Sequence, residues 1–249
     1  METFQNAPHI HLPEVDSTNN YASKLLKLPN TRNKTAITTD LQIEGKGQRG
    51  KTWISEARQN FLGTFIIQTQ LKAQSIFMLS KWVSWNICQV IQKYEITSAT
   101  IKWPNDIYVD NKKSGGILIE NHWQGNELTA SLVGIGININ NSPQALDQPT
   151  THLQLHSKRK ISANLFFQDL KTSFDDSWHL LQPEHNKTLD SLYHNELCGG
   201  DNEITTWLIP SSNLVIQAKI LKVHSDGAIE LELENEERKK YYHGEIFKK

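Results

Sequence analysis

Residues 45–52 read GKGQRGKT, a segment whose composition suits the binding of phosphate. The segment matches the Walker A pattern G-x-x-x-x-G-K-T and also the dinucleotide-binding pattern G-x-G-x-x-G. Its three glycines expose backbone N–H groups, and Lys46, Arg49 and Lys51 add three positive charges. A loop of this kind can wrap an anion, so we expect a phosphate or carboxylate ligand at this position.

The sequence around this loop fits neither pattern. Both patterns need a buried strand before the loop and a helix after it, because the helix N-terminus supplies part of the phosphate site. The preceding strand, residues 35–42, is polar, and residues 53–63 carry no helical stripe. A Walker B candidate ending at Asp110 runs into a turn, and residues 64–72 lack the acid that a dinucleotide site requires. The alternatives that remain are a phosphate loop of a third kind and a ligand-free surface loop.

Further polar residues follow at the ends of short strands. In residues 102–106 (KWPND) a proline fixes a bend that places Lys102 and Asp106 near a strand end. Lys113 then precedes paired glycines, which allow a ligand to approach the backbone closely. Asn138 ends a strand whose glycines leave one face bare. Cations beside exposed backbone suit a site in which two anions are brought together.

Periodicity and turn residues predict the elements that must position these groups. A cap at Asp16 or Ser17 predicts a helix that ends before Pro29. The Gly125-Asn126 pair predicts the turn of a hairpin. The hairpin strands are expected at 114–121 and 127–140, other strands at 9–15, 35–42, 60–70, 99–103, 106–109, 214–223, 227–234 and 239–247, and further helices at 75–94, 162–181 and 184–196.

The composition excludes several classes of protein. The net charge of −1 over 249 residues gives no general attraction to nucleic acid or to a membrane surface. No apolar run approaches the ~20 residues of a membrane helix, and the N-terminus has no secretory signal, so we expect a cytoplasmic protein. Cys88 and Cys198 lack the spacing of a metal pair, and the ten histidines are scattered.

Five segments, taken together, closely resemble those of biotin protein ligases. They are DSTN (16–19), GKGQRGKTW (45–53), KWPND (102–106), KKSGGIL (112–118) and GIGIN (134–138), in the order and spacing of that family. The terminal HGEI (243–246) is similar to the end of the family's small C-terminal domain. The resemblance implies an α+β fold. Residues 1–196 would form a class II synthetase-like catalytic domain, a mixed β-sheet packed with helices, and residues 197–249 a small SH3-like β-barrel.

The resemblance also implies an activity, that of a biotin–[acetyl-CoA-carboxylase] ligase. Biotin and ATP would form biotinyl-5'-AMP with release of pyrophosphate. A lysine of a biotin carboxyl carrier protein, from acetyl-CoA carboxylase or another biotin-dependent carboxylase, would then accept the biotin. Mg²⁺ is expected with ATP because the departing pyrophosphate is densely charged, and its ligands are left open. The protein would be a monomer or a homodimer.

The resemblance carries roles to individual residues of this sequence. The catalytic residues would be Lys113, Asp106 and Lys102. The biotin-binding residues would be Ser17, Thr18, Asn19, Gln42, Gly45, Lys46, Gly47, Arg49, Lys113, Gly115 and Gly116. The nucleotide-binding residues would be Lys46, Gln48, Arg49, Lys51, Trp53, Asn105 and Asn138.

Two departures from the family pattern bear on function. Many members carry an N-terminal helix-turn-helix that makes the ligase a repressor, whereas here DSTN begins at residue 16. We therefore expect no DNA-binding or repressor function. The fourth position of the loop is commonly Arg in the family, but here it is Gln48, with Arg49 next. This change bears on how tightly the loop holds an adenylate.

Three other functions compete with this interpretation. A lipoate–protein ligase has a related fold and also uses an acyl-adenylate, although the loop together with KWPND favours biotin. A non-catalytic regulator with this fold predicts loss of Lys113 or of the loop cations, and all are present. A nucleic-acid-binding module could use Tyr241 and Tyr242 beside two lysines, but aromatic packing against the main domain is the simpler explanation.

Overall fold

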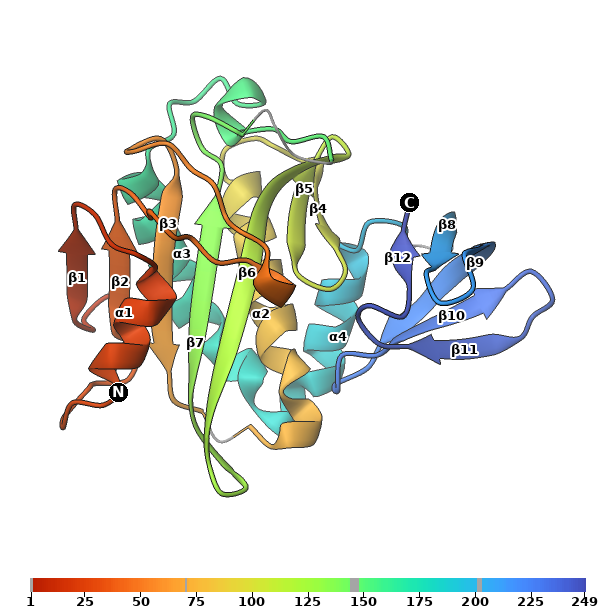
Figure 1. Ribbon diagram of the computed structural model, residues 1–249, viewed down its shortest axis with the longest axis horizontal. Helices are drawn as coiled ribbons and strands as arrows, with labels where there is room; N and C mark the ends of the chain where they lie inside the picture. Colours follow the sequence, from red (N-terminus) through yellow and green to blue (C-terminus); the bar gives the residue numbers. More distant parts are fainter. Residues whose placement is uncertain (1, 70, 144–147, 201–202) are drawn as a thin grey trace.

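The computed structural model describes residues 2–69, 71–143, 148–200 and 203–249. Its larger part is built on a seven-stranded sheet with the order β1-β2-β3-β7-β6-β5-β4 (Figure 1). β1 and β2 are parallel and the other neighbours are antiparallel, so the sheet is mixed as predicted. The strands are β1 (His9–Leu12), β2 (Ala36–Thr39), β3 (Phe61–Ile67), β4 (Ala99–Lys102), β5 (Asp106–Val109), β6 (Lys112–Gln124) and β7 (Glu127–Ile137).

The predicted hairpin is the longest feature of this sheet. β6 and β7 pair along most of their length and are joined at Gly125, whose φ of 61° suits a glycine turn. In this register Gly116 lies opposite Gly136, and Leu118 lies opposite Gly134. The cross-strand glycines therefore leave a strip of sheet without side chains, as expected from the sequence.

Helices cover the two faces of the sheet unequally. α2 (Phe77–Gln92), α3 (Ala163–Ser177) and α4 (Asn186–Asn195) build the main core on one side, where the Trp82 and Phe174 rings stack at 4.3 Å. The other face carries α1 (Thr18–Leu25), which packs Ala22 on Ile37, Ile66 and Leu132. Short 3₁₀ turns complete the chain: η1 (Gln48–Gly50), η2 (Ala73–Ser75), η3 (Leu153–Leu155), η4 (Trp178–Leu181) and η5 (Pro183–His185).

The C-terminal part forms a second, antiparallel sheet of five strands, in the order β11-β10-β9-β8-β12. This confirms the predicted fold class, while the division of the chain at residue 196 stays a prediction. The strands are β8 (Ile204–Ile209), β9 (Leu214–Val223), β10 (Ile229–Leu233), β11 (Arg238–Tyr241) and β12 (Phe247–Lys248). β8 was not predicted, and the single strand expected at 239–247 is wrong: the chain bends between β11 and β12 at Gly244, where φ is 97°.

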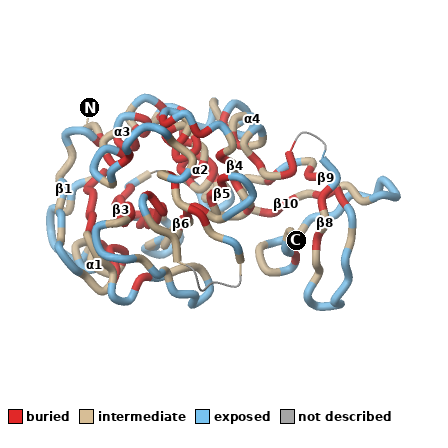
Figure 2. Tube along the Cα trace, turned by 90° about the horizontal axis from the view of Figure 1, so that it is seen from above, coloured by how far each residue is buried: buried red, intermediate tan, exposed pale blue. Residues whose placement is uncertain are grey.

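One continuous apolar core joins the two parts of the molecule. The buried cluster runs from Trp82 and Tyr193 beneath the large sheet to Trp207, Ile220 and Leu231 of the small one. Figure 2 shows most of the buried segments in the interior of the larger part and shorter ones along the C-terminal strands, with exposed chain around them. Within the described residues, no helix has the length and apolar character needed to span a membrane.

Candidate active site

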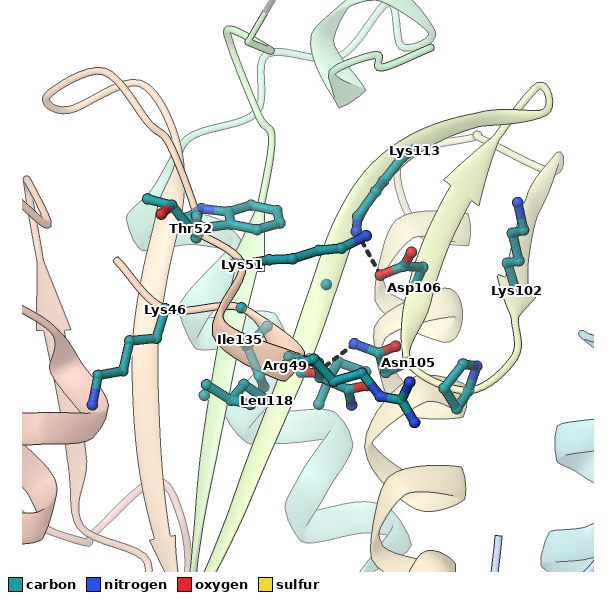
Figure 3. A pocket seen from close by; sticks show the side chains of 18 of the residues that line it. Lys46, Arg49, Lys51, Thr52, Lys102, Asn105, Asp106, Lys113, Leu118 and Ile135 are labelled. Atoms are coloured by element: carbon teal, nitrogen blue, oxygen red, sulfur yellow. Dashed lines mark hydrogen bonds and ion pairs between the residues drawn. The ribbon is translucent and has the colours of Figure 1, made fainter. Parts of the chain in front are cut away.

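A cavity of about 640 Å³ lies over the glycine strip, on the face of the sheet that carries α1. The glycine loop covers it, and the C-terminal segment closes one side with His243, Ile246, Phe247 and Lys248. A volume of this size suits a small-molecule ligand of the size of a nucleotide conjugate. The polar side chains around it come from segments far apart in the sequence (Figure 3).

The floor of the cavity is shaped by glycines and covered by an indole. A Cβ placed on Gly136 would lie 2.5 Å from Cε2 of Trp53, and one on Gly116 would lie 3.2 Å from its Cζ3. Any side chain at Gly136 would therefore push the indole off the sheet. The Trp53 ring and the bare strip together form a flat apolar surface of the kind that an aromatic base can contact.

One end of the cavity is lined by neutral polar groups of α1 and the segment after β2. The Thr18 backbone N–H and hydroxyl both donate to Oε1 of Gln42, at 2.8 and 3.0 Å. Because a backbone N–H must face an oxygen, this pair fixes the orientation of the Gln42 amide, and its NH₂ group has no acceptor among the described residues. Two hydrogen bonds fix the Asn19 side chain, which donates to Glu120 at 2.7 Å and accepts from Thr64 at 2.6 Å.

The other end of the cavity is positively charged. Nζ of Lys113 lies 2.7 Å from Oδ1 of Asp106, and both side chains are about one-fifth exposed. Lys51 points toward this pair (Figure 3). Lys102 donates to the Tyr108 hydroxyl at 3.3 Å, and burial lowers the pKa of its ammonium while Asp106 opposes the shift. The bend before Asp106 is fixed by Asn105, whose side chain donates to Ile117 O at 2.9 Å.

The glycine loop is a tight turn attached to the protein on both sides. Gly47 N donates to Lys51 O at 2.7 Å, and Trp53 N donates to Gly45 O at 2.8 Å. Lys46 Nζ donates to Asn20 Oδ1 of α1 at 2.5 Å, and the Arg49 guanidinium donates to the His243 carbonyl of the C-terminal part. Two of the three loop cations therefore contact protein acceptors.

Neither phosphate-loop pattern of the sequence is confirmed. The loop contains only the single turn η1, and among the residues described between 51 and 76 no α-helix begins before α2 at Phe77. The strand before it, β2, ends at Thr39. A Walker or dinucleotide loop would run directly from a strand into a helix, so the loop is of a different kind.

The structure brings most of the predicted site residues together. Those that line the cavity are Ser17, Thr18, Asn19, Gln42, Lys46, Gly47, Gln48, Arg49, Lys51, Trp53, Lys102, Asn105, Asp106, Lys113, Gly116 and Asn138. Gly45 and Gly115 are exceptions and do not form part of the lining. Gly45 packs against the Trp53 carbonyl, and Gly115 faces Ile137 and Ile107, so each serves the packing of the site rather than its surface.

Other lining residues were not assigned from the sequence. Gln148 accepts a hydrogen bond from the Tyr108 hydroxyl at 2.9 Å, and Thr150 lies beside the backbone of Lys113. The return of segment 148–151 across the sheet leaves no local signal in the sequence. Glu120, which accepts a hydrogen bond from Asn19, does have a local signal in the sequence, because an acid inside an apolar strand needs a polar partner.

Three buried polar atoms around the cavity have no hydrogen-bond partner within the described residues. They are Oε1 of Gln48, Nε1 of Trp53 and Oδ1 of Asn138. Leaving such groups unpaired costs ~1–3 kcal/mol each. All three belong to residues predicted to bind nucleotide, and a ligand in the cavity can supply their partners.

The fold and this site define a class of protein that solved structures already represent. The chain is similar to the biotin protein ligase of Aquifex aeolicus in complex with biotin and ATP, with a TM-score of 0.77, 22% identity, and coverage of 97% of this chain and 98% of that one. At this identity the likeness establishes the fold. The family model for the Biotin/lipoate A/B protein ligase family matches residues 12–138, and the chain belongs to this family.

Curated relatives agree with this assignment. The chain is 25% identical over 251 residues to the bifunctional ligase/repressor BirA of Bacillus subtilis, covering 99% of this chain and 76% of that protein. It is 33% identical over 136 residues to the biotin–[acetyl-CoA-carboxylase] ligase of Paracoccus denitrificans, covering 54% of this chain and 55% of the relative. The resemblance stated from five short segments is thereby confirmed.

Proposed function

We propose that this protein is a biotin–protein ligase that forms biotinyl-5'-AMP from biotin and ATP and transfers biotin to a lysine of a biotin carboxyl carrier protein. The observation that carries the proposal is the polarity of one cavity. Hydrogen-bonding amides lie at one end, Lys51, Lys102 and Lys113 lie at the other, and a flat apolar floor lies beside these three cations. Biotin has a ureido ring at one end and a carboxylate at the other, which matches this order.

In the first step the biotin carboxylate oxygen attacks the α-phosphorus of ATP, and the bond to the β-phosphate oxygen breaks as pyrophosphate leaves. Lys113 and Lys51 neutralise the two anions as they approach, which water in an open site does poorly. Asp106, 2.7 Å from Lys113, holds that ammonium in place. Adenine is accommodated by Trp53 and the glycine strip, with Asn138 within reach.

In the second step the neutral amine of the acceptor lysine attacks the acyl carbon. The acyl–phosphate C–O bond breaks, AMP leaves with the electron pair, and the new amide loses one proton. The glycine loop covers the mixed anhydride meanwhile and limits its hydrolysis. Magnesium is proposed to enter as the Mg²⁺ salt of ATP. Asp106 is the carboxylate among the described lining residues, so the phosphates supply most of the metal's ligands.

Three finer points belong to the same proposal. The acceptor is a carrier domain of acetyl-CoA carboxylase or of another biotin-dependent carboxylase, and the reaction takes place in the cytoplasm. Repressor activity is not proposed. The net charge of −1 supports this, and in the described residues α1–α3 pack against the large sheet while α4 packs against α2. Whether the ligase acts as a monomer or a homodimer is left open.

A Gln42→Glu variant is expected to bind biotin about tenfold or more weakly. The new carboxylate can still accept from Thr18, so the local fold is kept, but an acceptor replaces the outward NH₂ donor. An acceptor facing the ureido carbonyl loses a hydrogen bond and leaves a group unpaired, which costs ~1–3 kcal/mol. The measurement is the KM for biotin in biotin-dependent ATP–pyrophosphate exchange, with the KM for ATP expected to stay the same.

The matched control is Gln124→Glu, the same change at an exposed position of β6 outside the cavity. Exchange driven by lipoate is the companion assay, since a dithiolane ring has no oxygen acceptor for Gln42. Equal exchange with lipoate and biotin by the unchanged protein contradicts the proposed substrate. An unaltered KM for biotin in Gln42→Glu contradicts the placement of the ureido ring.

A further inference from the structure

One turn of the C-terminal sheet binds the larger part of the molecule through three carbonyl groups, one on every second residue. The β9–β10 turn, residues 223–227, accepts hydrogen bonds at the carbonyls of residues 223, 225 and 227. The donors are Nζ of Lys81 at 2.5 Å, the backbone N of Phe77 at 3.1 Å and Nε1 of Trp103 at 3.1 Å. Figure 1 shows the C-terminal sheet lying beside α4 and the short β4–β5 hairpin.

The contact between the 223–227 turn and α2 contains a buried charge and a glycine with no room for a side chain. The Lys81 side chain is 1% exposed and also donates to Asp190 of α4 at 2.5 Å, so a buried charge joins α2, α4 and β9. Gly227 has a φ of 94°, and a Cβ there would lie 2.9 Å from Cδ2 of Phe77. Both the conformation and the space at Gly227 therefore require glycine.

Trp103 connects this contact to the cavity. It is buried, it directly precedes the Pro104-Asn105-Asp106 bend, and its ring packs edge-on against His243 at 6.0 Å. On the far side of the bend, Asn105 bonds to Ile117 of β6 through both its side chain and its backbone carbonyl. The bend is therefore fixed at two places, by the catalytic sheet through Asn105 and by the C-terminal turn through Trp103.

We infer that the 223–227 turn positions the 103–106 bend, and with it the Asp106 carboxylate that holds Lys113. Trp103, which also lines the cavity, and Gly227 are positioning residues for adenylation, and the hydrogen bond between them acts through Asp106. The inference rests on the proposed adenylation and adds to it a defined task for the C-terminal sheet. The turn is not expected to affect binding of the ureido ring, because Thr18, at the start of α1, and Gln42 lie on the opposite side of the cavity.

The first test is Trp103→Phe, which keeps an aromatic ring and removes the Nε1 donor. Losing one hydrogen bond to this partly buried carbonyl corresponds to a change of up to about tenfold in an equilibrium or rate constant. We expect kcat for biotin-dependent ATP–pyrophosphate exchange to fall about that much, with the KM for biotin unchanged. Hydrogen exchange at the backbone amides of residues 103 and 105–107 is expected to become faster. The control is Trp123→Phe, the same change at an exposed position of β6.

The second test is Gly227→Ala, with Gly125→Ala as its control. Both glycines have positive φ, 94° and 61°, but a Cβ at Gly125 meets nothing within 4 Å. Both variants therefore introduce backbone strain. Only Gly227→Ala also adds a side chain that displaces the turn from Phe77. The expected result is the kcat loss and the faster exchange at 103 and 105–107 in Gly227→Ala alone.

The outcomes separate this inference from the proposed function. No exchange activity in the unchanged protein defeats the proposed function, while the hydrogen-exchange comparison still tests the turn. Full kcat and unchanged amide exchange in Trp103→Phe overturn the inference. It is also overturned if the loss of kcat is no larger than the fraction of the variant that is unfolded, because that result describes a stability effect only.

Discussion

A Lys113→Ala variant is expected to lose biotinyl-adenylate formation by a factor on the order of 10²–10³, the usual effect of removing one charge-stabilising contact in a transition state. Lys113 is the ammonium held by Asp106 at the charged end of the cavity. Without it, the carboxylate and the α-phosphate approach each other with less compensation of their charge. The measurement is the rate of biotin-dependent ATP–pyrophosphate exchange, together with the melting temperature.

The neighbouring residue provides the control. Lys112→Ala removes the same charge one position earlier on β6, where the side chain is exposed and outside the cavity. It is expected to keep nearly full activity. A folded Lys113→Ala protein with exchange close to that of the unchanged chain rules out the assigned role. Equal losses in the two variants mean that net charge, rather than position, sets the rate.

A Gln48→Arg variant is expected to retain its adenylate longer, by about ten- to a hundredfold in the dissociation rate. The Gln48 amide oxygen is buried in the loop without a partner in the described structure, and the residue lines the cavity. A guanidinium here adds a charge-assisted hydrogen bond to phosphate, worth ~1.5–3 kcal/mol. The neighbouring Arg49 does not supply this contact, because its guanidinium is bound to the His243 carbonyl.

The dissociation rate of pre-formed adenylate is measured by trapping released ligand. Gln68→Arg, which adds the same charge at an exposed position beyond β3, is the control and is expected to release adenylate at the original rate. An unchanged rate in Gln48→Arg means that the loop backbone or a re-oriented Arg49 already holds the phosphate. Slower release in both variants points to net charge instead.

The sequence predicted the sheet and most of the cavity because local signals coincide with it. Gly125-Asn126 specifies the hairpin, and the spacing of glycines in β6 and β7 specifies the strip beneath Trp53. What local patterns do not contain is the pairing of distant segments. The contact of Lys81 with the C-terminal turn joins residues 142 positions apart, and the identity of its partner depends on how two sheets dock.

The position of two predicted site residues outside the cavity lining has the same origin. Gly45 and Gly115 carry the glycine signal of a ligand contact, yet their neighbours are Trp53 and Ile137 of the protein itself. A glycine in a sequence indicates close approach, but not whether the approaching group is a ligand or another part of the chain. Arg49 likewise has the charge for phosphate, while its left-handed backbone (φ 55°) belongs to a turn that directs its side chain to the C-terminal part.

The continuous core beneath both sheets has a consequence for how the chain tolerates change. Trp207, Ile220 and Leu231 of the small sheet belong to the same buried cluster as Trp82 and Tyr193. The two parts therefore share one folding free energy, and a cavity-forming substitution in β9 or β10 reduces the population of the intact ligase site. Exchange of the C-terminal segment between relatives must accordingly preserve the apolar residues that face α2 and α4, and a compatible linker alone does not suffice.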